Sequence, residues 1–131
     1  MELIEYYRIY GKEIDSKIKQ AITEDKITAD VTTDLVLAGK AGSQKLKAVL
    51  LCKQDCVLAG IEIFKRTYSL IDKNVKFRQF ATDGQRVKKG SKVLEVTASR
   101  SVLLRGERTA LNFLQRMSGI ATMTNSFVKQ L

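Results

Sequence analysis

The sequence has 131 residues, with 23 Lys and Arg against 14 Asp and Glu, which gives a formal net charge of +9. This length suits one domain with a core of its own. The chain contains no histidine, which excludes a Ser-His-Asp triad, a Cys-His pair and every His-ligated metal site within these residues. No apolar run approaches the ~20 residues of a membrane-spanning helix, and the acidic, amphipathic start of the chain does not resemble a secretory signal.

Two cysteines, Cys52 and Cys56, are too few for a disulfide framework, and no second pair completes a zinc site. We therefore expect buried or half-buried free thiols and a cytoplasmic location, and a metal or redox role is the alternative. The positive charge raises the hypothesis of a nucleic-acid partner. The basic residues are spread along the chain, however, and aromatic residues make up only 7%. We therefore expect the positive electrostatic field of the chain to attract a small anionic substrate. We expect neither a nucleic acid nor a membrane as partner.

The first part of the chain is predicted to be helical. Apolar residues recur at spacings of three and four over residues 1–22, which predicts a helix. Gly11 interrupts this pattern, so we expect two pieces, the second beginning near Asp15 or Ser16. Residues 23–34 are rich in short polar side chains that compete for backbone hydrogen bonds, which predicts a loop.

Short strands are predicted next. Residues 35–37 begin a strand, and the glycines within residues 38–43 predict a turn. Residues 45–52 contain a short apolar run and are predicted to form a strand. A turn over residues 53–55 then leads to a second short strand over residues 56–59.

The middle of the chain alternates between helix and strand patterns. Residues 61–71 carry apolar side chains at spacings of three and four, which predicts a helix that packs one face on a sheet. Residues 75–78 and residues 94–98 alternate between apolar and polar side chains, as half-buried strands do. Between them, Asp83-Gly84 and the glycine of residues 88–90 predict two closely spaced turns.

The last segment is predicted to be a helix capped by Ser99 or Ser101. Residues 118–119, Ser-Gly, are predicted to kink or interrupt it, and no glycine or asparagine follows it as a C-cap. Four apolar residues form its predicted buried stripe, namely Leu104, Leu111, Leu114 and Met117.

The strongest local feature is a polar face on this helix, made by Arg105, Arg108, Asn112 and Arg116. Guanidinium groups are planar forks that match carboxylate and phosphate oxygens. This face is therefore a candidate site for a dicarboxylate, and a solvated helix face is the alternative.

Two acidic positions are further candidates. Glu107 either fixes an arginine, acts as an acid or base, or forms a structural ion pair. Asp30 with Thr32 and Thr33 either binds a metal ion or caps the loop backbone.

The run GERTALNFLQRMSGIAT at residues 106–122 resembles the signature helix of quinolinate phosphoribosyltransferases, also called carboxylating nicotinate-nucleotide pyrophosphorylases. Three other segments resemble the same family in the same order, at residues 24–34, residues 57–60 and residues 83–90. The resemblance extends from about residue 15 to residue 131. Ala29 and Cys56 stand where this family usually has glycine.

The resemblance implies an α+β fold with a small, mostly antiparallel sheet, a hammerhead-like double turn and covering helices. It divides the chain into an N-terminal domain over residues 1–105 and a signature helix over residues 106–131. The family's catalytic α/β barrel follows this helix and is absent from these residues. The resemblance therefore implies an N-terminal domain alone.

The family joins quinolinate to phosphoribosyl pyrophosphate and releases nicotinate mononucleotide, pyrophosphate and carbon dioxide in NAD biosynthesis. The resemblance implies a homodimer or higher homo-oligomer in which Arg108 reaches the quinolinate of the neighbouring subunit. Arg105, Asn112 and Arg116 have weaker claims as substrate ligands. It implies Mg²⁺ in the full-length enzyme, with no metal and no catalytic residue in this chain, which by itself is expected to be inactive.

Three alternatives stay open. A related enzyme-superfamily member associated with molybdenum transport shares this N-terminal architecture. A non-catalytic dimerisation module would form a symmetric dimer without binding quinolinate. A basic nucleic-acid binder would show strongly salt-dependent affinity.

Overall fold

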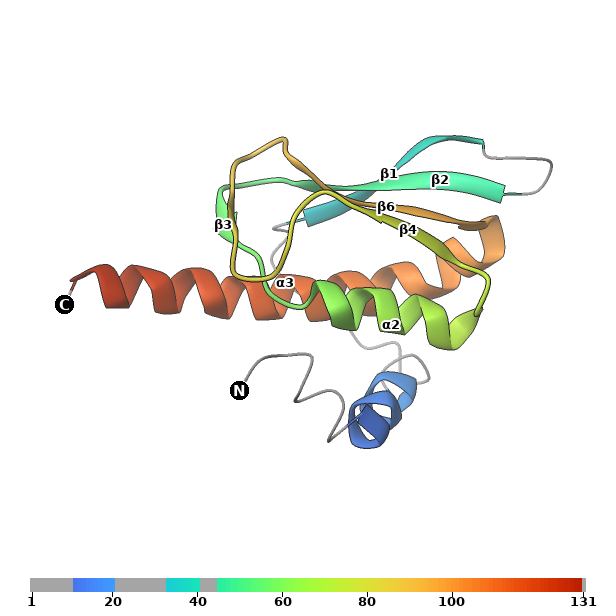
Figure 1. Ribbon diagram of the computed structural model, residues 1–131, viewed down its shortest axis with the longest axis horizontal. Helices are drawn as coiled ribbons and strands as arrows, with labels where there is room; N and C mark the ends of the chain where they lie inside the picture. The colour runs from blue at the N-terminus through green and yellow to red at the C-terminus, as the bar shows by residue number, and fades with distance from the viewer. Residues whose placement is uncertain (1–10, 21–32, 41–44, 131) are drawn as a thin grey trace.

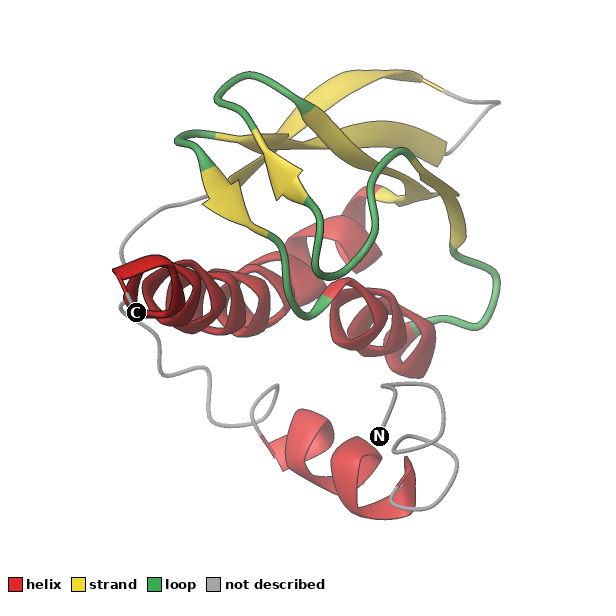
Figure 2. Ribbon diagram, turned by 60° about the vertical axis from the view of Figure 1, so that its left-hand side comes forward, coloured by secondary structure: helices red, strands yellow, loops and turns green. Residues whose placement is uncertain are grey.

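The computed structural model describes residues 11–20, 33–40 and 45–130. A four-stranded antiparallel sheet lies over two helices that run side by side beneath one of its faces (Figure 1, Figure 2). In chain order, the labelled elements are β1 (Thr33–Lys40), β2 (Lys45–Cys52), β3 (Cys56–Val57), α2 (Ile61–Ile71), β4 (Lys76–Gln79), β5 (Arg86–Val87), β6 (Lys92–Ser99) and α3 (Arg100–Gln130). This architecture confirms the predicted α+β fold class, and the described residues form no α/β barrel.

The sheet has the strand order β1-β2-β6-β4, and alternate side chains of its central strands form the core. Leu50 of β2 lies opposite Leu94 of β6, and Ala48 lies opposite Val96. All four are buried, and they pack in the same apolar cluster as Tyr68 of α2. The predicted bounds of β2 are confirmed, and its short apolar run at residues 48–50 is buried.

The first strand is longer than predicted. Thr33 and Asp34 were expected in a loop, and residues 38–40 were expected in a turn, but all of them belong to β1. The reason is that β1 pairs with β2 along its whole length, with a bulge between Leu37 and Gly39. Gly39 has a φ of 145°, which glycine adopts without strain. The rest of the predicted loop and turn lies outside the described residues.

Residues 11–20 form one helical segment, on the side of α2 away from the sheet (Figure 2). The prediction of a helix start near Asp15 or Ser16 is therefore wrong. Asp15 does not cap this segment. Its carboxylate accepts two hydrogen bonds from Arg66 of α2, at 3.0 and 2.8 Å. This paired geometry ties the segment to α2.

The predicted double turn is confirmed, and it supports a small second sheet. Gly84 and Gly90 both have a φ of 88°, which favours glycine. Between them, β5 pairs with β3 in antiparallel fashion. The strand expected over residues 56–59 ends at Val57, because Leu58 bonds to the turn instead, donating to the Gln85 carbonyl at 3.0 Å.

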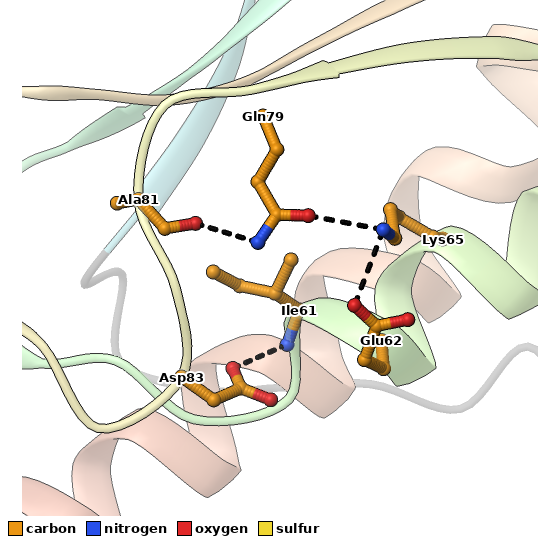
Figure 3. Close-up of polar contacts among 6 residues, drawn as sticks. All are labelled: Ile61, Glu62, Lys65, Gln79, Ala81 and Asp83. Atoms are coloured by element: carbon orange, nitrogen blue, oxygen red, sulfur yellow. Dashed lines mark hydrogen bonds and ion pairs between the residues drawn. The ribbon is translucent and has the colours of Figure 1, made fainter. Parts of the chain in front are cut away.

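The first of these turns also caps α2. The residue before α2 is a glycine and offers no side-chain cap. Asp83, which is remote in the sequence, supplies the cap, because its Oδ1 accepts a hydrogen bond from the Ile61 backbone N–H at 2.9 Å (Figure 3). A carboxylate at this end also favours the helix dipole. Beside the cap, Lys65 lies 3.1 Å from Glu62 and donates to Gln79 at 3.0 Å.

The long helix α3 begins as predicted and differs from prediction further along. The Ser99 hydroxyl accepts a hydrogen bond from the Val102 N–H at 3.3 Å, which makes Ser99 the N-cap. The predicted interruption at residues 118–119 is wrong, because α3 continues through both residues. Leu104 was assigned to the buried stripe, but 61% of its surface is exposed, since it lies on the side of α3 away from the core.

The two helices approach closely at Gly106. A Cβ atom there would lie 2.6 Å from Cε1 of Tyr68 and 2.9 Å from Cδ1 of Ile71. The Tyr68 hydroxyl donates to the Leu103 carbonyl of α3 at 3.0 Å, which adds a directional bond to this packing. The domain boundary predicted between residues 105 and 106 lies inside α3, and the division itself stays a prediction.

Gly106→Ala is expected to lower the free energy of unfolding by about 1–3 kcal/mol, because the added methyl group overpacks the helix contact. Gly119→Ala is the matched control on the same helix, since no described atom lies within 4 Å of its Cβ position. That change is expected to stabilise α3 by up to ~1 kcal/mol through helix propensity. Urea unfolding followed by circular dichroism measures both, and equal effects of the two changes would contradict the packing argument.

Candidate functional site

The predicted polar face of α3 divides into exposed and buried residues. Arg105, Arg108 and Arg116 are exposed residues on one long helix. Asn112 is buried instead, with 8% of its surface exposed. The structure therefore places three cations on the surface of α3 and keeps the predicted amide beneath it.

Asn112 belongs to a buried polar seam between α3 and β1. One turn along the helix, Gln115 donates from Nε2 to the Thr33 carbonyl at 2.9 Å. Neither Asn112 Oδ1 nor Thr33 Oγ1 has a hydrogen-bond partner among the described residues. A buried polar atom without a partner costs about 1–3 kcal/mol, so this seam is a place where the fold gives up stability. Asp30 and Thr32, the other members of the proposed acidic-threonine site, lie outside the described residues.

Glu107 lies next to Arg108 on the half-buried side of α3. Burial raises the pKa of its carboxyl above the ordinary value, and the negative charge of Asp34 on β1 raises it further. Burial likewise raises the pKa of Tyr68, with the charge of Glu107 as the second cause. Burial and the carboxylate of Asp34 thus disfavour the ionised form of Glu107, and the charge of Glu107 in turn disfavours ionisation of the Tyr68 phenol.

Two hydroxyl residues of α3 hold the segment that connects β3 to α2, and our sequence analysis missed them. Ser118 Oγ accepts from the Ala59 N–H at 3.1 Å and donates to the Ala59 carbonyl at 3.2 Å. Thr122 Oγ1 accepts from the Val57 N–H at 2.9 Å and donates to the Ser118 carbonyl at 2.7 Å. The signal in the sequence is a pair of small hydroxyl residues four apart inside a helix, where they fit only if their hydroxyls have partners.

The two cysteines are free and buried, as predicted. Cys56 also lines a cavity of about 500 Å³ between the turn after β2 and the C-terminal half of α3. The other walls include Met123 and Phe127. Within the described ranges, no group of three or more His, Cys, Asp or Glu side chains could hold a metal ion. In the same part of the chain, no helix is long and apolar enough to cross a membrane.

Comparisons with known proteins agree on one family. The sequence profile described as "Quinolinate phosphoribosyl transferase, N-terminal domain" matches residues 30–118. A probable carboxylating nicotinate-nucleotide pyrophosphorylase of Bacillus subtilis is 38% identical over 108 residues, which are 82% of this chain and 36% of the relative. A chloroplastic carboxylating nicotinate-nucleotide pyrophosphorylase of Arabidopsis thaliana is 34% identical over 113 residues, which are 86% of this chain and 32% of the relative.

Solved structures agree with the sequence comparisons. The crystal structure of NadC from Streptococcus pyogenes matches with a TM-score of 0.74 and 38% identity, over 89% of this chain and 41% of that one. The nicotinate-nucleotide pyrophosphorylase of Francisella tularensis matches with a TM-score of 0.73 and 28% identity, over 88% of this chain and 40% of that one.

The fold and these matches define an α+β N-terminal domain of the phosphoribosyltransferase class. More particularly, the chain belongs to the quinolinate phosphoribosyl transferase family, whose N-terminal domain it carries. The family resemblance seen in residues 106–122 is thereby confirmed. The chain spans about a third of the length of the first two curated relatives, at 36% and 32%.

Glu107→Gln is expected to stabilise the chain at pH 7. The folded-state pKa of Glu107 is raised above its ordinary value of 4.5, so the folded chain binds this proton more tightly than the unfolded chain. Stability is therefore lost as the pH rises from about 4.5 through the raised pKa, and it stays lost above that value. Below pH 4.5 the carboxyl is protonated in both states, and the substitution should have little effect.

Urea unfolding of both proteins between pH 4 and pH 7 measures this difference. Asp34→Asn is the companion variant, because removing that charge should narrow the pH window over which Glu107 costs stability. A stabilisation by Glu107→Gln that is the same at every pH would show that the effect is not electrostatic.

Proposed function

We propose that this chain is the substrate-covering, dimer-forming N-terminal domain of an enzyme of NAD biosynthesis. That enzyme joins quinolinate to phosphoribosyl pyrophosphate and forms nicotinate mononucleotide, pyrophosphate and carbon dioxide. The family match over residues 30–118, together with exposed arginines on a rigid helix, is the observation that carries the proposal. We place the enzyme in the cytoplasm, because its two cysteines are free thiols.

Arg108 is the residue to which we assign quinolinate recognition. It is exposed on α3, and its planar guanidinium can donate two parallel hydrogen bonds to one carboxylate. Quinolinate carries two carboxylates on a flat ring, so a fixed fork orients the ring as well as attracting it. In the dimer that we propose, Arg108 serves the site of the neighbouring subunit, which is the arrangement that the family resemblance implies. Arg105 and Arg116 flank it as weaker ligands.

Asn112 is the weakest of the proposed ligands. It is buried beneath the exposed arginines, and its Oδ1 has no partner among the described residues. We assign it a role in holding the helix surface below Arg108 rather than direct contact with the ring.

The reaction requires cationic groups around the departing pyrophosphate, and the family resemblance implies Mg²⁺ in the full-length enzyme. The described part of this chain holds no cluster of three side chains that could ligate a metal ion. We therefore assign no metal ligand to these residues. Their proposed contribution is to bind and orient a carboxylate and to exclude water from the neighbouring site.

Arg108→Ala is expected to raise the KM for quinolinate by about 10- to 100-fold, since a lost charged hydrogen bond costs about 1.5–3 kcal/mol. The measurement uses a chimera in which this chain replaces the matching part of the Bacillus subtilis relative. The KM of Arg108→Lys should lie between those of the unaltered chimera and of Arg108→Ala, because an ammonium cannot form the paired contact. Arg100→Ala, an exposed change at the start of the same helix, is the control. An unchanged KM and kcat in Arg108→Ala would sink the assignment.

The chain by itself is expected to form no nicotinate mononucleotide. It spans 36% of the length of the Bacillus subtilis relative, and we assign the reacting groups to the remainder. Chromatography of a mixture of the chain, quinolinate, phosphoribosyl pyrophosphate and Mg²⁺ checks this expectation, with the chimera as positive control. Product formed by the chain alone would refute the proposed division of labour.

A further inference from the structure

The two cysteine sulfurs lie side by side at one end of the sheet. Cys52 ends β2, Cys56 begins β3, and their Sγ atoms are 3.5 Å apart. Backbone bonds hold Cys52 in place, because its N–H donates to the Ser91 carbonyl at 3.0 Å and its carbonyl accepts from Gly90 at 2.8 Å. A disulfide has a sulfur–sulfur bond of about 2.05 Å. Closing this pair therefore needs a movement of roughly 1.5 Å.

Both cysteines are buried, with 2% of each exposed, but they differ in their position relative to two cavities. Cys56 lines the cavity of about 500 Å³ beside α3, whose walls include Thr122 and Met123. It also lines an adjoining cavity of about 400 Å³, whose walls include Arg86 and Lys129. Cys52 lines neither of these two cavities. A small oxidant in either cavity is therefore nearer to Cys56 than to Cys52.

We propose that Cys52 and Cys56 form a peroxide-reactive dithiol, in which Cys56 is oxidised first and Cys52 then closes an intrachain disulfide. This inference goes beyond the proposed function and does not depend on it. Transient disulfides of this kind are the form in which cytosolic proteins use oxidation. The oxidant class is a hydroperoxide, with hydrogen peroxide as the smallest member.

The chemistry balances in two steps. The deprotonated sulfur of Cys56 attacks one oxygen of hydrogen peroxide, the O–O bond breaks, and the departing hydroxide takes up the thiol proton as water. This leaves Cys56 as a sulfenic acid. The sulfur of Cys52 then attacks the sulfur of Cys56, the S–O bond breaks, and the second hydroxide leaves as water with the proton of Cys52. Two thiols are oxidised by two electrons, and one peroxide is reduced to two waters.

The charges around the pair support the assigned order. Burial, together with the hydrogen bond to Cys56, raises the pKa of Cys52 to about 12. Burial also raises the pKa of Cys56, but the hydrogen bond from Cys52 lowers it. The charge of Asp55 raises both, while Arg86 and Lys129 line the cavity on its other sides. Burial thus disfavours both thiolates, but the hydrogen bond between the two sulfurs favours the thiolate of Cys56 over that of Cys52, and the thiolate is the reactive form.

The experiment treats the folded chain with hydrogen peroxide, blocks remaining thiols by alkylation and measures the intact mass. The expected product is a monomer that has lost about 2 Da, with no alkylated thiol, and that regains both thiols with dithiothreitol. The rate should rise with pH below the thiol pKa. Mixed oxidation products without the intrachain disulfide, or only disulfide-linked dimers, would overturn the proposal.

Two single variants test the order of the steps. Cys52→Ser should stop at a sulfenic acid on Cys56, which dimedone traps, whereas Cys56→Ser should slow the reaction with peroxide by about tenfold or more. Equal trapping at Cys52 in the Cys56→Ser variant would reverse the assigned order. Since the unaltered chain gives the mass readout, the proposal stays testable even if a variant does not fold. If a urea-unfolded sample forms the disulfide faster than the folded chain, the folded geometry does not promote the reaction between the two cysteines, and the proposal is wrong.

Discussion

The contact between Gly106 and the ring of Tyr68 is the constraint on which the rest of the structure depends. The ring occupies the space that any larger residue at position 106 would need, and close-packed interiors have no room to spare. With α2 and α3 at this separation, the pair forms one apolar surface beneath β2 and β6. A wider separation would expose both the inner face of the sheet and the Tyr68 hydroxyl, which is satisfied only by the backbone of α3.

The same packing fixes the position of the exposed arginines on α3. The helix is held by its cap at Ser99, by Tyr68 at Gly106, and by the hydroxyls of Ser118 and Thr122 near its middle. These contacts reach different elements, so the helix is fixed in both position and rotation. Side chains on such an element are placed more precisely than those on loops. The buried polar seam at β1 gives up some of the stability that this packing provides.

Sequence periodicity predicted β2, α2 and β6 well, because each buries one face against the core. It failed where distant contacts override local preference. The turn expected at residues 38–40 is a strand because β2 offers a partner along the whole edge. The interruption expected at residues 118–119 is absent because Ser118 bonds to Ala59, 59 positions away. The role proposed for Arg108 came from the family resemblance, since helical spacing alone cannot distinguish a ligand-binding face from a solvated one.

Because α3 is uninterrupted, the angle about the helix axis between its arginine face and its exposed apolar end is fixed. Its 31 residues extend about 46 Å at 1.5 Å per residue, and its far end carries exposed apolar side chains, among them Met123 and Phe127. Arg108 and Phe127 are 19 positions apart, or about 28 Å along one rod. Inserting a single residue between them would turn one surface by about 100° against the other and lengthen the rod by only about 1.5 Å. The number of residues between the two surfaces therefore sets the angle between them about the helix axis as well as their distance.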